Sequence, residues 1–157
     1  MPNENEILQK LLLKILTYRI TRNLDKELES RKITHLELSR NTGGNTNWFN
    51  RRFNELKDIK LSTFVKIIVA INKIISENSK FEPVEVNSVL TPEVLLMASV
   101  SIDLAINDID YLLANDEDFK KFFLSMQFYV NNIKALNNVI AQEEIAVFEK
   151  IMIQIND

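Results

Sequence analysis

Residues 45–52 bring together the side-chain types that distinguish nucleic-acid bases. Asparagine can form two hydrogen bonds with adenine, arginine can form two with guanine, and threonine can contact the methyl group of thymine. Three further cations, Arg52, Lys57 and Lys60, are of the type that binds phosphates and adds affinity with little sequence information. This chemistry predicts contact with a nucleic-acid duplex. The candidate base-reading residues are Asn45, Thr46, Asn47, Asn50 and Arg51.

Simpler roles are available to each of these side chains. Arg51 and Arg52 could form a solvent-exposed helix face, and Asn45 is better suited to capping a helix than to contacting a base. Residues 46–47 would face outward in either case. Trp48, the only tryptophan, fits a packed hydrophobic position better than a wedge between bases.

The composition of the 157-residue chain excludes many kinds of catalytic site. Its two glycines, Gly43 and Gly44, are adjacent, whereas a phosphate-binding P-loop needs two separated glycines and a dinucleotide motif needs three. The chain has no cysteine and one histidine, His35, which excludes thiol catalysis, cysteine–zinc sites and histidine-rich metal sites. Paired acids such as Asp108 and Asp110 diverge on a helix and have no accompanying base. We therefore expect no enzymatic activity, no cofactor and no metal.

Charge is unevenly divided between the two halves of the chain. The net charge is −3, but residues 1–80 contain 15 basic and 9 acidic residues, whereas residues 81–157 contain 4 and 13. Only the basic first half is suited to a polyanion. The acidic, polar N-terminus is not typical of a signal peptide, and no run of about 18 apolar residues is free of charge. We expect a soluble, cytoplasmic protein without a membrane partner.

Two longer helices are predicted in the first half. Apolar residues at spacings of three and four predict helix over residues 4–30, as one helix or as two. The same periodicity predicts a helix over residues 61–75. The buried face of this later helix would comprise Phe64, Ile67, Ile68, Ile71 and Ile75.

Two shorter helices are predicted between them. Thr34 and Glu37 form a capping-box pattern that starts one helix, and Gly43 suits its C-terminal end. The next helix is expected over residues 46–54, with Phe49 facing inward. Two short helices joined by a tight glycine turn are typical of a helix-turn-helix, whose second helix enters the major groove of DNA.

These residues resemble the helix-turn-helix of lambda-repressor-like regulators, also called the Cro-type or XRE family. The similarity begins at the capping box and includes Leu38, the small residue Ser39, Gly43 and the inward Phe49. It continues through the helix predicted over residues 61–75. The resemblance covers only the N-terminal half of the chain, roughly residues 18–76.

The resemblance implies an N-terminal domain of four to five helices with an exposed recognition helix. It also implies that Thr34 and His35, at the start of the second helix, approach a phosphate of the DNA. The chain departs from the family pattern at Gly44, Arg52 and Glu55. These departures are expected to change how the recognition helix is rotated about its axis, or the point at which the chain leaves it.

A further helix is predicted at the start of the second half. Thr91, Pro92 and Glu93 are a strong helix start, and the apolar pattern extends this helix to about Ala114. Its apolar side is expected to comprise Leu95, Ala98, Ile102, Ile106, Ile109 and Leu113.

Apolar residues then follow a heptad-like spacing, which resumes in another helix after a turn near residues 137–142. Such a small unit can form an intramolecular core, an interface with a second copy, or both. Because operator half-sites are read by dimers, we expect oligomerisation. The residues expected to carry it are Phe119, Phe122, Met126, Tyr129, Ile133, Leu136, Ile140, Phe148, Met152 and Ile155.

The whole sequence predicts an all-α protein. Its parts are a helix-turn-helix domain over residues 1–78, a linker over residues 79–90, and a small three-helix bundle or hairpin over residues 91–157. We expect a transcriptional regulator, a repressor, that binds double-stranded DNA as a homodimer through its C-terminal helices. The alternative is a helix-turn-helix-derived module that binds another protein, as an antirepressor or an inhibitor of a regulator, and does not bind DNA. A protein partner of the acidic half is compatible with either function.

Overall fold

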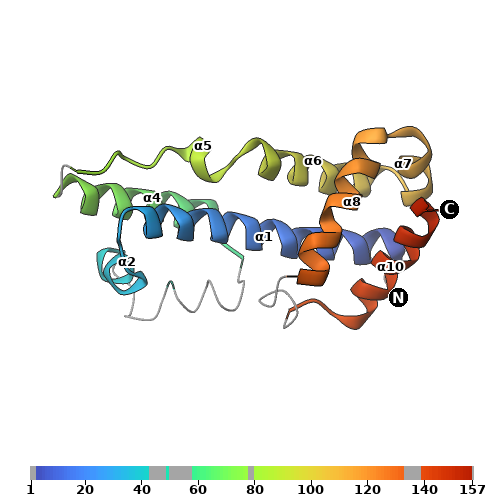
Figure 1. Cartoon of the computed structure of the whole chain (residues 1–157), viewed down its shortest axis with the longest axis horizontal. Helices are drawn as coiled ribbons and strands as arrows, with labels where there is room; N and C mark the ends of the chain where they lie inside the picture. The colour runs from blue at the N-terminus through green and yellow to red at the C-terminus, as the bar shows by residue number, and fades with distance from the viewer. Residues whose placement is uncertain (1–2, 43–48, 50–57, 78–79, 133–138, 157) are drawn as a thin grey trace. The chain divides into compact units, whose positions relative to one another are not determined.

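A computed structural model describes residues 3–42, 49, 58–77, 80–132 and 139–156. All regular secondary structure in these ranges is helical, which confirms the predicted all-α class (Figure 1). The chain divides into two compact units, and we describe each by itself. Unit 1 comprises residues 1–16 and 95–157, and unit 2 comprises residues 17–94.

Helix α1 (Glu4–Ser30) is one continuous helix, which settles the choice between one helix and two. No glycine or proline interrupts these residues, so every backbone group inside the segment can keep its helical hydrogen bond. Asn3 caps its start, because the backbone N–H of Glu6 donates to the Asn3 side chain at 2.9 Å. The Glu6 carboxylate in turn accepts from the backbone N–H of Asn3 at 3.3 Å, which completes a reciprocal cap.

The chain leaves α1 through Lys32, the only described non-glycine residue with a positive φ, at 58°. The backbone N–H of Lys32 donates to Glu29 O and that of Ile33 donates to Leu28 O, each within 3.1 Å. These two bonds form a Schellman cap, in which a left-handed residue is normally glycine. Ile33 and Leu28 are both buried, so the turn places the chain against the core at the cost of strain at Lys32.

Unit 2 contains the C-terminal part of α1 with helices α2 (His35–Asn41), α4 (Leu61–Ser76) and α5 (Val86–Val89). The predicted cap at Thr34 is confirmed, because its hydroxyl accepts from the backbone N–H of Glu37 at 3.1 Å. The predicted buried face of α4 is also confirmed. One hydrophobic cluster contains Leu24, Leu28, Ile33, Leu38, Phe49, Phe64, Ile67, Ile68, Ala70, Ile71, Ile75, Val84 and Val89.

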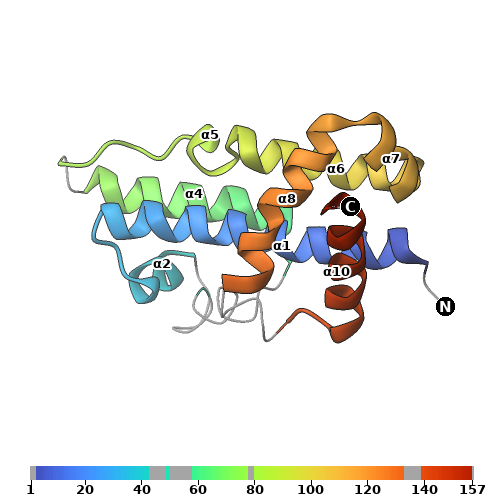
Figure 2. The ribbon, with the colours of Figure 1, turned by 45° about the vertical axis from the view of Figure 1, so that its right-hand side comes forward.

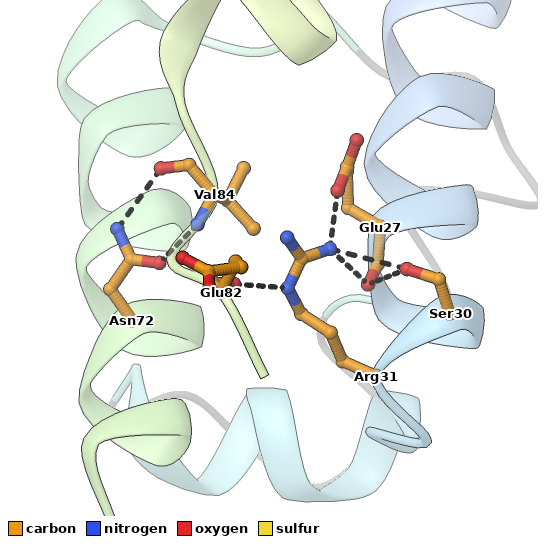
Figure 3. A network of polar contacts seen from close by, with 6 residues as sticks. All are labelled: Glu27, Ser30, Arg31, Asn72, Glu82 and Val84. Carbon is orange, nitrogen blue, oxygen red and sulfur yellow. Dashed lines mark hydrogen bonds and ion pairs between the residues drawn. The ribbon is translucent and has the colours of Figure 1, made fainter. Parts of the chain in front are cut away.

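The segment predicted as a linker belongs to unit 2 and packs against its helices. Val84 and Val89 are buried in its core, and Val84 exchanges two backbone hydrogen bonds with the Asn72 side chain, at 2.7 and 3.2 Å (Figure 3). Arg31 holds the same segment from the other side through Glu82 O at 2.9 Å. Within unit 2, residues 82–90 therefore cover α1 and α4 rather than spanning open solvent.

Unit 1 contains the N-terminal part of α1, most of α6 (Pro92–Ile106), and three further helices. These are α7 (Ile109–Asn115), α8 (Glu117–Asn132) and α10 (Gln142–Asn156). Figure 2 shows α10 beside the N-terminal part of α1. Two ion pairs join these helices, one between Lys14 and the buried Glu144, the other between Lys150 and Glu4.

The prediction of a single helix over residues 91–114 is wrong, because the chain breaks between α6 and α7. Asp108 caps α7 by accepting from the backbone N–H of Tyr111 at 2.8 Å. The Asn5 amide donates to the carbonyls of Leu104 and Asn107 at 2.9 and 2.7 Å. These side chains replace the hydrogen bonds that the break removes.

The expected orientation of α6 is also wrong. Its buried side chains include Val94, Met97 and Leu104, whereas Leu95, Ile102 and Ile106 are 57, 60 and 76% exposed. Because α6 is apolar on most of its surface, periodicity alone did not identify the inner face.

Seven of the ten residues expected to carry oligomerisation are buried within a single chain. Phe123, beside them on α8, stacks on Phe148 of α10 with ring centroids 4.9 Å apart. Ile155 is partly buried, and Ile133 and Leu136 lie outside the described residues. An oligomeric role for this set stays a prediction. The buried members are Phe119, Phe122, Met126, Tyr129, Ile140, Phe148 and Met152.

Replacing Lys32 by glycine should raise the free energy of unfolding by about 0.5–1 kcal/mol. Glycine adopts positive φ without the steric penalty of a Cβ, which outweighs the extra entropy of its unfolded chain. Chemical denaturation measures the change. The matched control, Lys26→Gly on the exposed face of α1, should lower stability by about 0.7–1 kcal/mol. Equal destabilisation by both substitutions would contradict the left-handed conformation of Lys32.

Candidate nucleic-acid interface

The structure describes part of the predicted interface. Thr34 and Lys60 are exposed at the starts of α2 and α4, and His35 is partly buried. The other predicted contact residues lie outside the described residues, so their roles stay predictions. They are Asn45, Thr46, Asn47, Asn50, Arg51, Arg52 and Lys57.

Phe49 is the described residue in the middle of that segment, and it is fully buried. Its backbone N–H donates to the hydroxyl of Ser39 at 3.2 Å, although the two residues are ten positions apart. Ser39 is itself completely buried on α2. This bond therefore holds the backbone of Phe49 directly against α2.

The imidazole of His35 forms the second contact with Phe49. The two rings meet edge to face, with centroids 4.9 Å apart and an interplanar angle of 78°. Such an arrangement places the positive edge of one ring against the negative face of the other. Phe49 is thus in contact with the first residue of α2 and hydrogen-bonded to a residue one turn later.

His35 is also bound to α1. Its Nε2 lies 2.6 Å from Oδ1 of Asp25. This carboxylate is on α1 and is buried. Oδ2 of Asp25 accepts from Arg22 at 2.8 Å, and Arg22 also pairs with Glu29 at 3.2 Å. The proposed phosphate contact of His35 stays a prediction, but its Nε2 is engaged inside the protein.

Electrostatics favour the cationic form of Arg22 within this network. Burial opposes the charge of Arg22, yet the hydrogen bond to Glu29 and the charges of Glu29 and Asp25 outweigh it and raise the pKa of Arg22. Arg22 therefore stays a cation and holds Asp25 in the orientation that receives His35. The series of contacts from Arg22 through Asp25 and His35 to Phe49 therefore links α1 and α2 to Phe49.

Net positive charge resides in the unit that contains this network. Residues 17–94 contain 13 basic and 10 acidic side chains, whereas unit 1 contains 6 and 12. Arg40 on α2 and Lys60 before α4 are exposed, and neither is adjacent in sequence to an aspartate or a glutamate. The candidate interface is therefore the part of the molecule best able to attract phosphates.

Sequence reasoning missed the roles of Arg22 and Asp25. A signal was present, because Asp25 lies between Leu24 and Leu28 on the apolar side of the helix, where an acid needs a buried partner. The single histidine was the available partner. His35 lies ten residues after Asp25 and on another helix, so helical spacing did not indicate that the two side chains pair.

Comparisons with family models, curated proteins and solved structures found no match to this chain. In the described ranges, no helix is both long and apolar enough to span a bilayer. Within the same ranges, no three histidine, cysteine or acidic side chains gather as metal ligands would.

Replacing Ser39 by alanine should lower the free energy of unfolding by about 0.5–1.5 kcal/mol. The substitution removes the buried hydrogen bond between the Phe49 N–H and the Ser39 hydroxyl, and a buried hydrogen bond contributes about that much to stability. Urea denaturation followed by circular dichroism measures the loss. Ser62→Ala, at an exposed position at the start of α4, should change stability by less than about 0.5 kcal/mol. Equal effects of the two substitutions would show that the bond to Phe49 contributes nothing.

Proposed function

We propose that this chain is a sequence-specific DNA-binding transcriptional regulator, which represses by occupying its operator. The observation that carries the proposal is the buried position of Phe49, hydrogen-bonded to Ser39 and in ring contact with His35. A helix-turn-helix needs such a contact, because its second helix must be held rigidly across the first. The proposal also rests on the sequence resemblance to lambda-repressor-like regulators.

The residues around Phe49 supply the chemistry of base recognition. A helix with position 49 on its inner face has positions 47 and 51 on its outer face, and these are Asn47 and Arg51. Asparagine suits adenine and arginine suits guanine in the major groove. Thr34 and Lys60, both exposed, would contact the phosphate backbone and orient the helix.

We propose that the chain acts as a homodimer through its C-terminal helices. A single recognition helix reads only a few base pairs, and a second copy doubles the site. Most of the described heptad residues are buried within one chain, so the apolar side chains that remain for a second copy include Leu95, Ile102 and Ile106 of α6. The acidic surface of unit 1 would repel DNA and leave unit 2 to face it.

A protein-binding module without DNA affinity is the second candidate. One observation favours it: the Nε2 of His35, expected near a phosphate, is engaged by Asp25. The departures from the family pattern at Gly44, Arg52 and Glu55 agree with it. An antirepressor or an inhibitor of another regulator would use the same fold in this way.

Selection of bound duplexes from a random DNA pool separates the two candidates. The full chain is incubated with the pool, and bound duplexes are amplified and sequenced over several rounds. A regulator that acts as a homodimer enriches two half-sites about one helical turn apart. An enriched single half-site would retain DNA binding but overturn the dimer, and no enrichment would favour the protein-binding module.

Replacing Arg51 by alanine should weaken binding to the selected duplex by about 1–3 kcal/mol, and should relax the preference at one base pair of each half-site. Fluorescence anisotropy on the selected duplex and on its single-base variants measures both effects. The control, Lys121→Ala at an exposed position of α8 in the acidic unit, should leave affinity unchanged. Unchanged affinity and preference in the Arg51 variant would remove this residue from the interface.

A further inference from the structure

Helix α4 presents an apolar ridge on its outer face. We define the ridge as Leu61, Val65 and Val69, which are 75, 50 and 59% exposed. Their spacing of four residues places them along one side of the helix, over a length of about 12 Å. A surface helix normally places polar residues there, so three exposed aliphatic side chains in line are unusual.

The ridge cannot be hidden by rotation of α4. The opposite side of the helix is fixed by six buried residues, which belong to the core of unit 2. Asn72, near the ridge on α4, is held by its two bonds to Val84. The outer face of α4 is therefore a permanent feature of the folded unit.

Positive charge borders the ridge on one side. Lys66 and Lys73 are exposed, lie seven residues apart, and so occupy the same edge of α4. No acidic residue occurs between positions 61 and 76. The face is therefore apolar along its length and cationic along one edge.

We propose that this ridge is the docking site for an amphipathic helix of another protein, with acidic residues beside its apolar stripe. Residues four apart form a ridge that packs into the groove of a facing helix. Acidic side chains on the partner would lie opposite Lys66 and Lys73 and would select it by charge. The proposal goes beyond the DNA-binding function and does not depend on it.

Two other occupants fit this face less well. DNA phosphates gain nothing from leucine and valine, since their contacts are made by cations and hydrogen-bond donors. A second copy of α4 packed antiparallel on the first would place its lysine edge beside Lys66 and Lys73, and like charges in contact are destabilising. An acidic helix satisfies both the apolar ridge and the charged edge.

The test is a selection with a displayed library of helical 20-residue peptides on the full-length chain. We expect the enriched peptides to carry apolar residues at helical spacing with aspartate or glutamate beside them. Binding of each synthetic peptide, labelled with fluorescein, is then measured by anisotropy. Failure to enrich any acidic amphipathic peptide would overturn the proposal.

Variants of the ridge make the test specific. The triple substitution Leu61→Gln, Val65→Gln, Val69→Gln should lower peptide affinity at least about tenfold, because it removes the buried apolar contacts. Glutamine is a better helix former than valine, so the fold should be retained, and thermal unfolding checks this. Ile153→Gln on α10, where the side chain is 63% exposed, is the control and should leave peptide affinity unchanged.

Charge reversal tests the choice of partner. Lys66→Glu with Lys73→Glu should weaken binding of the acidic peptide by about three- to tenfold, and raising the salt concentration should reduce this difference.

Equal affinity of the wild type and the triple glutamine variant would overturn the site. Conversion of an oligomer to a monomer by that variant, measured by light scattering, would instead assign the ridge to contact between copies. Binding of the selected DNA duplex by the triple glutamine variant should be unaffected, so failure here is separable from failure of the regulator proposal.

Discussion

The burial of one aromatic ring, Phe49, is the constraint on which the candidate interface depends. It shares a single hydrophobic cluster with Leu38 of α2 and Phe64 of α4, and its backbone is bonded to Ser39. The network from Arg22 through Asp25 ends at His35, whose ring contacts the Phe49 ring edge to face. Helix starts and turns around this cluster, including the strained turn at Lys32, bring the chain into position for that contact.

Features that depend on near neighbours in sequence could be predicted. The cap at Thr34 needs only Glu37 three residues later, and the inner face of α4 follows from strict periodicity with lysines on the outside. The burial of Phe49 followed from its place after the glycine turn. The cap depends on a contact within three residues, and on α4 the buried face is marked by its apolar spacing.

Features that depend on distant partners could not be predicted. The break after α6 is stabilised by Asn5, about a hundred residues away, and α6 offered apolar side chains on both its faces. Asp25 and His35 meet across two helices without any periodic relation. The predicted boundary after residue 78 also differs from the observed grouping, in which residues 80–94 belong with unit 2 and residues 1–16 with the C-terminal helices. A continuous α1 supplies buried residues to both units, such as Leu11 and Leu24, which a linear division of the chain does not anticipate.

The salt dependence of binding to a mixed-sequence 30-base-pair duplex tests the central claim most directly. Anisotropy titrations of the full chain between about 50 and 200 mM salt give the slope of log affinity against log salt concentration, which is about −0.9 for each phosphate neutralised. A regulator held to the backbone by several cations should give a slope of about −4 or steeper. No measurable binding at the lowest salt, or an affinity independent of salt, would contradict the account and leave the buried Phe49 as part of a protein-binding module.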